Sequence, residues 1–188
     1  MNIADAQRPN PVGAEAIRAL AAKFMPKGKF LPLTDGEDVA IPPQPYVAPQ
    51  GKPDAVIVDI DGTVAHMVGR SPYEWHRVGE DEPDEVVVGL VHDFYTHLGC
   101  EIIFVSGRDE VCREATKDWL NWNVVDGFHL YMRPEGDQRK DAIVKRGLFD
   151  EHIRDNFNVR FVLDDRKQVV DMWRSLGLTC LQVADGDF

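Results

Sequence analysis

The sequence predicts an α/β domain in which helices cover both faces of a mostly parallel, five-stranded sheet. Three observations predict it. From residue 54 onward, short continuous apolar runs have the length and composition of strands buried in a parallel sheet. These runs alternate with segments of helix length, which is typical of parallel α/β architecture. The chain of 188 residues is long enough for one such domain with an appendage.

The first half of the domain is expected to contain two strands and two helices. Residues 55–60 (AVIVDI) are apolar almost throughout and predict the first, buried strand. Residues 86–98 predict a helix, because Gly99 can end it and the acidic side chains before it suit a helix N-terminus. The apolar residues 102–105 predict the second strand, and residues 109–122 predict the helix that follows it.

The second half repeats the same alternation. Strands are expected at residues 128–131, 159–163 and 179–183, and helices at residues 139–153 and 167–176. The helical segments are expected to place further apolar side chains in the core, namely Ile143, Leu148, Phe149, Trp119, Trp122 and Trp173. In a sheet of this type the ligand lies beyond the carboxyl ends of the strands, so the residues just after each strand are the candidates for function.

The first fifty residues differ in composition from the rest, so we divide the chain into a segment 1–50 and a domain 51–188. Residues 14–24 have apolar side chains at helical spacing and predict a short helix. The residues after this helix are rich in Pro and Gly, which favours either a stiff, extended tether or a strap that lies on the domain surface.

The composition excludes several classes of protein. With 21 Lys and Arg residues against 32 Asp and Glu, the net charge of −11 argues against coating nucleic acid, although a locally basic pocket can still bind one phosphate. The cysteines, Cys100, Cys112 and Cys180, are widely spaced and are expected to be buried, reduced thiols. Neither a secretory signal nor an apolar run of membrane-spanning length is found. We expect a cytoplasmic protein without membrane partners.

Polar residues recur just past the ends of the predicted strands. Taken alone, each group has an ordinary structural explanation, such as a turn, a loop tripeptide, a solvated ion pair or a helix cap. Together they are expected to meet at one edge of the sheet, which those separate explanations do not predict. The groups are Asp59 and Asp61 in DIDGT, Ser106-Gly107-Arg108, Asp141 with Lys145 one helical turn later, and Asp164-Asp165.

This order of groups resembles the four motifs of the haloacid dehalogenase superfamily of phosphotransferases. The resemblance implies a Rossmann-like fold. It also implies that Asp59 is a nucleophile that forms an aspartyl-phosphate. Asp61 would act as the general acid for the leaving oxygen and then as the general base for the attacking water.

The same resemblance implies a cofactor, because a phosphomonoester dianion needs charge neutralisation before a carboxylate attacks it. Mg²⁺ would lie between Asp59, the backbone carbonyl of Asp61 and one carboxylate of the final acidic pair. We favour Asp165 as the direct ligand, with Asp164 as its neighbour. The residues implied to bind the phosphoryl group are Ser106, Lys145, Thr63 and Gly107.

A closer resemblance covers residues 51–188. The domain is similar to the 3′-phosphatase domain of bacteriophage-type polynucleotide kinase-phosphatases in the segments GKPDAVIVDIDGTVAHMVGRSPYEW, RPEGDQRKDAIVK and LDDRKQVVDMWRSLGLTCLQVADGDF. Bifunctional members carry a kinase domain before the phosphatase, but the chain has no GxxxxGK[ST] phosphate loop, so kinase activity is not expected. The side chains implied to support the phosphate and catalysis are Arg70, Arg108, Arg133 and Asp141, with Arg139 as a further candidate.

The spacing of the motifs leaves no room for a large cap domain and only enough for a short flap, about residues 64–84, over the site. An open site suits a bulky substrate such as a polymer end, although a homo-oligomer could enclose a smaller one. Within the flap, Tyr73 and Trp75 could stack on a terminal base or pack the flap down. The acidic run 80–85 is expected to be a solvated loop that leads into a helix, and His66 to be exposed.

The sequence therefore predicts an Mg²⁺-dependent polynucleotide 3′-phosphatase for DNA or RNA repair, whose partners are 3′-phosphorylated nucleic-acid ends. Activity on 2′,3′-cyclic phosphates stays open. The first alternative is a phosphatase of free nucleotides, which has the same chemistry but a different substrate. The second alternative is a catalytically idle domain that binds a partner, and it predicts the decay of at least one motif, whereas all four are intact.

Overall fold

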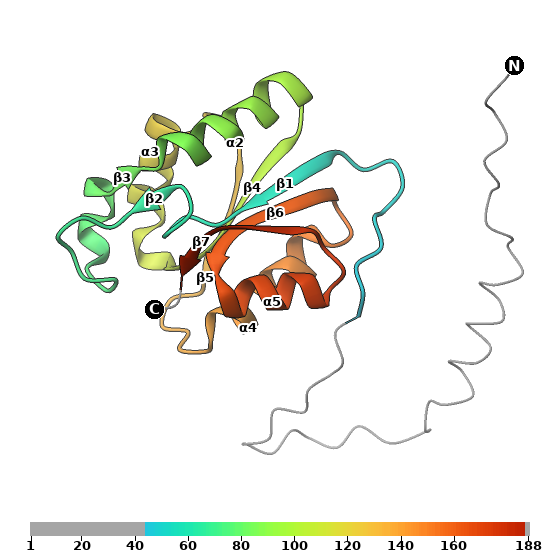
Figure 1. The fold of residues 1–188 in the computed structure, drawn as a ribbon. Coiled ribbons are helices and arrows are strands. Elements are labelled where there is room, and N and C mark those ends of the chain that lie inside the picture. The colour runs from blue at the N-terminus through green and yellow to red at the C-terminus, as the bar shows by residue number, and fades with distance from the viewer. Residues whose placement is uncertain (1–43, 187–188) are drawn as a thin grey trace, which may run out of the picture. The chain divides into compact units, whose positions relative to one another are not determined.

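A parallel sheet of five strands forms the centre of the computed structural model, which describes residues 44–186 (Figure 1). The strand order is β5-β4-β1-β6-β7, and every neighbouring pair is parallel. β1 lies in the middle, where Val58 is in register with Phe104 of β4 and Leu163 of β6. The strands are β1 (Asp54–Val58), β4 (Glu101–Asp109), β5 (His129–Arg133), β6 (Asn158–Arg166) and β7 (Cys180–Gly186).

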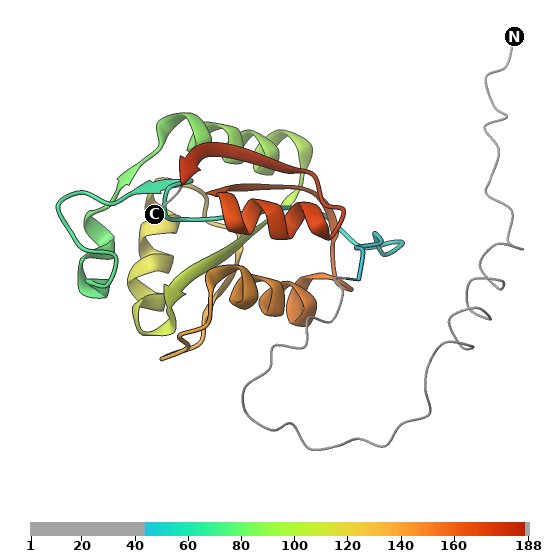
Figure 2. The same cartoon turned by 60° about the horizontal axis from the view of Figure 1, so that its bottom comes forward.

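Helices cover both faces of this sheet, as the turned view in Figure 2 also shows. On one face α2 and α3 pack around Val56 and Val58, and on the other α4 and α5 pack around Ala55 and Ile57. Side chains alternate along a strand, so the apolar run of β1 supplies both cores. The predicted fold class is confirmed. The helices are α2 (Glu85–Leu98), α3 (Arg113–Asn123), α4 (Asp141–Leu148) and α5 (Lys167–Ser175), with a π-helical turn at Phe149–Ile153 after α4 and a 3₁₀ turn at Glu110–Cys112 before α3.

Strands β4 and β6 extend past the apolar residues that predicted them, and their extra residues belong to the site. β4 continues to Asp109 and β6 to Arg166, beyond the apolar runs that predicted them. The pairing register shifts between Ser106 and Asp109 in β4, and between Asp164 and Arg166 in β6. The polar motifs therefore lie on irregular strand ends instead of in separate loops.

Two side chains that we expected in the core are exposed. The sequence placed Ile143 inward, but it is 42% exposed. Trp122 is 89% exposed, because it lies two residues after the buried Leu120 and therefore about 200° further around α3. The residues that α4 does bury are Asp141, Val144, Lys145 and Leu148, at positions i, i+3, i+4 and i+7.

Residues 44–50 are the described part of the predicted tether, and Tyr46 joins them to the domain. Its hydroxyl donates to the carbonyl of Phe157 and accepts from the N–H of Val159, both at 2.8 Å. Its own N–H donates to the carbonyl of Leu176 at 2.7 Å. In this short stretch the chain is a strap on the domain surface. The helix predicted at residues 14–24 lies outside the described residues.

The segment between β1 and α2 forms a small flap. It consists of a two-stranded antiparallel ribbon, β2 (Ala65–His66) with β3 (Glu82–Pro83), and a 3₁₀ helix, η1 (Trp75–Glu80). Trp75 packs the base of this flap against a small apolar cluster that includes Val78. Within residues 44–186 no large cap domain is inserted between the elements of the sheet, which agrees with the motif spacing.

The acidic run before α2 divides into side chains with different roles. Asp84 caps the helix, because its carboxylate accepts from the N–H groups of Val86 and Val87 at 3.1 and 3.0 Å. These bonds, together with His66 at 3.0 Å, lower the pKa of Asp84. Asp81, in contrast, is buried, so the expectation of a fully solvated loop is wrong at this position.

The three cysteines are free and buried, as we expected. Burial raises the pKa of the Cys180 thiol to about 12, which keeps it protonated and unreactive. None of the helices formed by residues 44–186 combines the length and the apolar character that crossing a bilayer requires.

Candidate active site

A buried lysine lies among the acidic side chains that the sequence singled out. The Lys145 ammonium donates to Asp59 Oδ1 at 2.7 Å and to Asp164 Oδ2 at 3.0 Å. Asp141 Oδ2, one helical turn earlier in α4, is 3.6 Å from the same nitrogen. All four side chains are buried. The carboxyl ends of β1 and β6 and the inner face of α4 therefore meet here, as the motif order predicts.

The opposite charges in this cluster offset only part of the cost of burying them. Burial raises the pKa of Asp59 well above its usual range, and the Lys145 ammonium offsets only some of this effect. Burial alone would lower the pKa of Lys145, but the negative charges of Asp164, Asp59 and Asp141 raise it overall. Lys145 is therefore charged at neutral pH. Asp141 also pairs with Arg133 and Arg166, but Asp59 and Asp164 share the single Lys145 ammonium, so a further cation beside these two carboxyl groups would be stabilising.

The carboxylates of Asp59, Asp164 and Asp165 offer the geometry for such a cation, since one oxygen of each lies within 4.8 Å of the others. Asp165 Oδ2 is buried and has no hydrogen-bond partner among the described residues. Asp164 is engaged by other groups, because its Oδ2 also accepts from Trp173 Nε1 at 3.2 Å and its Oδ1 accepts from the N–H of Arg166 at 3.2 Å. The set of oxygen ligands fits Mg²⁺.

Three glycines, Gly62, Gly107 and Gly186, let the chain approach these carboxylates closely. A Cβ on Gly186 would collide with the carboxylate of Asp165. Gly62 has a φ of +82°, in the left-handed region, and a Cβ there would collide with the carboxylate of Asp165. A Cβ on Gly107 would collide with the carboxylate of Asp141. The glycines of DIDGT and of the second motif are thus required by the close packing of the site.

Asp61 belongs to a second charged cluster, built around Arg108. Arg108 donates from Nε to Asp61 Oδ2 at 2.9 Å and from Nη2 to Asp61 Oδ1 at 2.7 Å. Its Nη2 also donates to Asp81 Oδ2 at 2.6 Å, and its Nη1 donates to Thr116 Oγ1 at 3.3 Å. The two hydrogen bonds from Arg108 fix the orientation of the Asp61 carboxylate, whose side chain lines the cavity and is 25% exposed.

Asp81 is the residue of this cluster that the sequence did not indicate. Arg70 donates to both of its oxygens at 2.6 Å, and Arg70 Nη2 reaches Asp61 Oδ1 at 3.4 Å. The Asp81 side chain is fully buried, and its backbone carbonyl accepts from Trp119 Nε1 at 2.8 Å. Arg70 and Arg108 are therefore bridged by one carboxylate. No signal in the sequence indicates this role, because four further acids surround Asp81 within residues 80–85 and the two arginines are distant in the chain.

Arg133 makes the hydrogen bonds that hold the loop before α4 beside the two charged clusters. Its Nε donates to the carbonyl of Gly107 at 2.8 Å, its Nη2 to Asp141 Oδ1 at 3.1 Å, and its Nη1 to the carbonyl of Arg139 at 2.7 Å. The Arg139 side chain is 58% exposed and pairs with Asp137, whose pKa it lowers to about 2. Arg133 thus orders the loop before α4, and Arg139 presents its charge at the rim.

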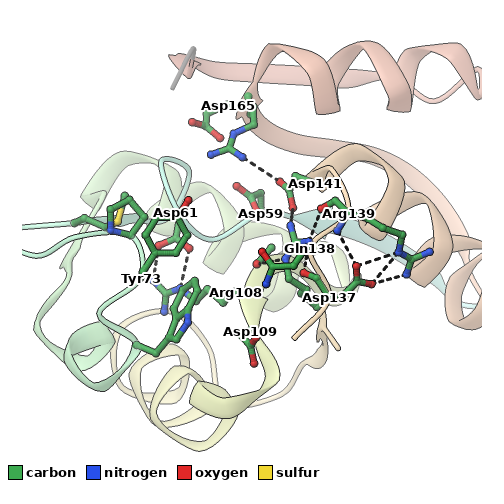
Figure 3. Close-up of a pocket in the computed structure, with 16 residues that line it drawn as sticks. Asp59, Asp61, Tyr73, Arg108, Asp109, Asp137, Gln138, Arg139, Asp141 and Asp165 are labelled. Atoms are coloured by element: carbon green, nitrogen blue, oxygen red, sulfur yellow. Dashed lines mark hydrogen bonds and ion pairs between the residues drawn. The ribbon is translucent and has the colours of Figure 1, made fainter. Parts of the chain in front are cut away.

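The two clusters and the loop line an open cavity of about 320 Å³ (Figure 3). Ser106, Thr63 and Lys145 are buried and do not line it: the Ser106 hydroxyl accepts from the N–H of Arg108 at 3.2 Å, and Thr63 Oγ1 donates to Asp59 Oδ2 at 3.5 Å. The lining residues are Asp59, Asp61, Met67, Pro72, Tyr73, Trp75, Gly107, Arg108, Asp109, Arg133, Asp137, Gln138, Arg139, Asp141, Asp165 and Arg166.

The parallel sheet and the arrangement of these motifs define a phosphatase of the haloacid dehalogenase type. Comparison with protein families identifies the family within this class. Residues 53–188 match the model of the polynucleotide kinase PNKP phosphatase domain, so the chain belongs to this family and is a phosphoric monoester hydrolase. The resemblance inferred from the motifs is confirmed.

Individual relatives agree with this assignment. A protein of Autographa californica nuclear polyhedrosis virus, assigned as a bifunctional polynucleotide kinase/RNA ligase, is 34% identical over 170 residues, which are 88% of this chain and 22% of that protein. A chain in a structure of the Pnkp1/Rnl/Hen1 RNA repair complex is 34% identical, with a TM-score of 0.72, 97% of this chain covered and 59% of the other. The chain thus spans less than two thirds of the relatives it matches.

A more distant structure shows how widely the fold is shared. A class C acid phosphatase from Bacillus anthracis, solved with tungstate bound, has a TM-score of 0.53 and 15% identity, with 94% of this chain and 74% of that chain covered. At this level of identity the likeness concerns the fold alone.

Proposed function

We propose that the protein is an Mg²⁺-dependent 3′-phosphatase of nucleic-acid ends, acting in RNA or DNA repair. The observation that carries the proposal is the buried cluster of Asp59, Lys145, Asp164 and Asp165 at the floor of an open cavity, in a member of this phosphatase family. The small flap leaves the cavity accessible to the end of a polymer. Relatives that carry polynucleotide kinase and RNA repair names support the choice of substrate.

The chemistry proceeds in two displacements. An Asp59 carboxylate oxygen bonds to phosphorus while the bond from phosphorus to the 3′ oxygen breaks, and Asp61 gives a proton to that oxygen. Water then bonds to phosphorus and loses a proton to Asp61, while the bond to Asp59 breaks and inorganic phosphate leaves. Arg108 and Arg70 hold Asp61 in position. The Lys145 ammonium supports the negative charge of Asp59 before the first displacement and again after the second, when Asp59 is a free carboxylate.

Mg²⁺ would be held by Asp59 and Asp165, with the Asp61 backbone carbonyl, and would neutralise charge between nucleophile and phosphate. Asp164 positions Lys145 and Trp173 in this arrangement. We favour Asp165 as the direct ligand because its Oδ2 alone of these buried oxygens lacks a partner among residues 44–186.

Removing the metal is expected to abolish activity and to lower stability. At a Mg²⁺ concentration a hundred times its Kd, binding should raise the Tm by about 5–10 °C. Asp165→Asn should lose this Mg²⁺-dependent shift, whereas Asp171→Asn, on the outer surface of α5, should keep it. Calorimetry with EDTA and with added Mg²⁺ measures both. An undiminished shift in Asp165→Asn would exclude this residue as the ligand.

Asp81→Asn tests the bridge between the two arginines. The amide keeps the shape but loses the charge that both guanidinium groups share, so Arg70, Arg108 and with them Asp61 should shift. We expect kcat to fall by about 10- to 100-fold, with a smaller change in KM. Glu82→Gln, at the exposed neighbouring position, is the matched control. An unchanged kcat in folded Asp81→Asn would contradict a positioning role.

The substrate is tested by comparing a 3′-phosphorylated oligonucleotide with 3′- and 5′-mononucleotides. The proposal predicts the higher kcat/KM for the oligonucleotide, and turnover of the mononucleotides alone would establish the alternative function. The same assay with DNA, RNA and 2′,3′-cyclic phosphate ends determines the preferred polymer and whether the cyclic ester is opened.

A further inference from the structure

An exposed aromatic side chain stands at the rim of the active-site cavity. Tyr73 is 81% exposed, although it lines the same cavity as Asp59 and Asp61. In Figure 3 it lies beside Asp61 and Arg108, at the edge of the site formed by the flap. Its ring makes an edge contact with Trp75, with centroids 6.3 Å apart and planes at 85°. An aromatic ring this exposed contributes little to folding.

The flap holds this ring in a defined place. Trp75, its neighbour, packs on the apolar cluster of Val78, Cys112 and Met132. The N–H of Ser71 donates to Glu74 Oε2 at 2.6 Å, and Arg77 donates to the carbonyl of Gly69 at 2.8 Å. Arg70 anchors the start of the flap to the buried Asp81. Ligand binding to a ring that is already positioned costs little conformational entropy.

A second depression, of about 420 Å³, lies on the other side of the two rings. It shares Tyr73 and Trp75 with the active-site cavity, so the aromatic pair stands between the two. Its wall is mainly apolar and carries Glu114 but no Lys or Arg, which is unfavourable for a phosphate and suitable for a base. Its lining residues are Tyr73, Trp75, His76, Val111, Cys112, Glu114 and Ala115.

We propose that Tyr73 and Trp75 form a nucleobase platform. The base of the 3′-terminal nucleotide stacks on Tyr73 while its phosphate enters the cavity, and the base of the preceding nucleotide lies in the second depression. The inference rests on the proposed function, because only a nucleotide carries a base next to the reacting phosphate. Stacking tolerates any base, so the platform selects for a nucleic-acid end and not for its sequence. Because the second depression offers no Lys or Arg to a phosphate, the polymer is held weakly after the reaction.

The test uses three substrates: a 3′-phosphorylated trinucleotide, the same trinucleotide with an abasic terminal residue, and glycerol 2-phosphate, which has no ring. One stacked base is worth ~1–3 kcal/mol, and every 1.4 kcal/mol is tenfold, so Tyr73→Ala should lower the ratio of kcat/KM for the trinucleotide to that for glycerol 2-phosphate by about 5- to 150-fold. The loss should be mainly in KM. Tyr73→Phe should keep the ratio within about twofold, since the ring remains.

The abasic substrate and a surface control complete the experiment. The wild-type protein should lose a similar factor with the abasic end, and Tyr73→Ala should lose nothing more on it. Trp122→Ala removes an equally exposed ring from α3, away from the cavity, and should leave every ratio unchanged. If the wild type turns over the trinucleotide but Tyr73→Ala keeps its ratio, the platform is wrong and the proposed function stands. If the wild type does not turn over the trinucleotide, the proposed function itself fails.

Discussion

Asp59→Asn is expected to lower kcat on the order of 10⁴-fold or more, because the amide oxygen is too weak a nucleophile to form the aspartyl-phosphate. The substitution changes one buried atom and keeps an acceptor for the Lys145 ammonium, which donates to Asp59 at 2.7 Å in the native protein. The fold should therefore survive, and the loss should appear in single-turnover kinetics as a loss of chemistry.

The matched control for this substitution is Asp118→Asn, which makes the same chemical change on the exposed face of α3 and should leave kcat unchanged. Circular dichroism checks that both variants are folded. Mg²⁺-dependent turnover by Asp59→Asn at the wild-type rate would overturn the covalent mechanism.

Lys145→Met should have the second largest effect, on stability as well as on activity. Without the ammonium, Asp59 and Asp164 are left buried with no cationic partner among the described residues, whereas Asp141 keeps its pairs with Arg133 and Arg166. Breaking a buried ion pair by removing one partner costs about 3–5 kcal/mol, so the free energy of unfolding should fall by about this amount in urea with EDTA present. We expect kcat to fall by about 10²- to 10³-fold, because a preorganised charge on the transferring group is lost.

The pH dependence of this effect follows from the direction of the pKa shift. Since the pKa of Lys145 is higher in the folded protein than its usual value, its contribution is fully present at neutral pH and is lost only as the pH rises above the ordinary lysine range. Lys145→Met should thus be less stable than the wild type throughout the range from pH 6 to 9. Lys117→Met, on the surface of α3, serves as the control. A variant as stable as the wild type would show that the cluster does not depend on this ammonium.

The sequence predicted the sheet and the site well where apolar residues form strands and polar residues follow the strand ends. The apolar run of β1 identified the central strand, and the polar residues after β1, β4 and β6 do meet at one edge of the sheet. The helices were located correctly, but the register of α4 was not. The buried face of α4 carries Asp141 and Lys145. A prediction from apolar residues alone therefore placed Ile143 on the buried face, although it is exposed. Where a helix buries charged residues for function, the spacing of its apolar residues no longer identifies its buried face.

Asp81 shows a different limit. Nothing local distinguishes it from Glu80, Glu82 or Glu85, which are exposed, and its burial depends on two arginines that are 11 and 27 residues away. Only the fold of the flap over β4 brings these groups together. The Tyr73 ring is a similar case, because its exposure and its place between two depressions are properties of the surface and not of the sequence.

The most direct test of the proposed function uses one oligonucleotide that carries a phosphate at both its 3′ and its 5′ end, incubated with the protein and Mg²⁺ and followed by mass spectrometry. A second digestion that removes only 5′-terminal phosphate identifies which end has reacted. The proposed function predicts that the 3′-phosphate is lost and the 5′-phosphate is retained. Loss of the 5′-phosphate instead, or equal loss from both ends, would contradict it.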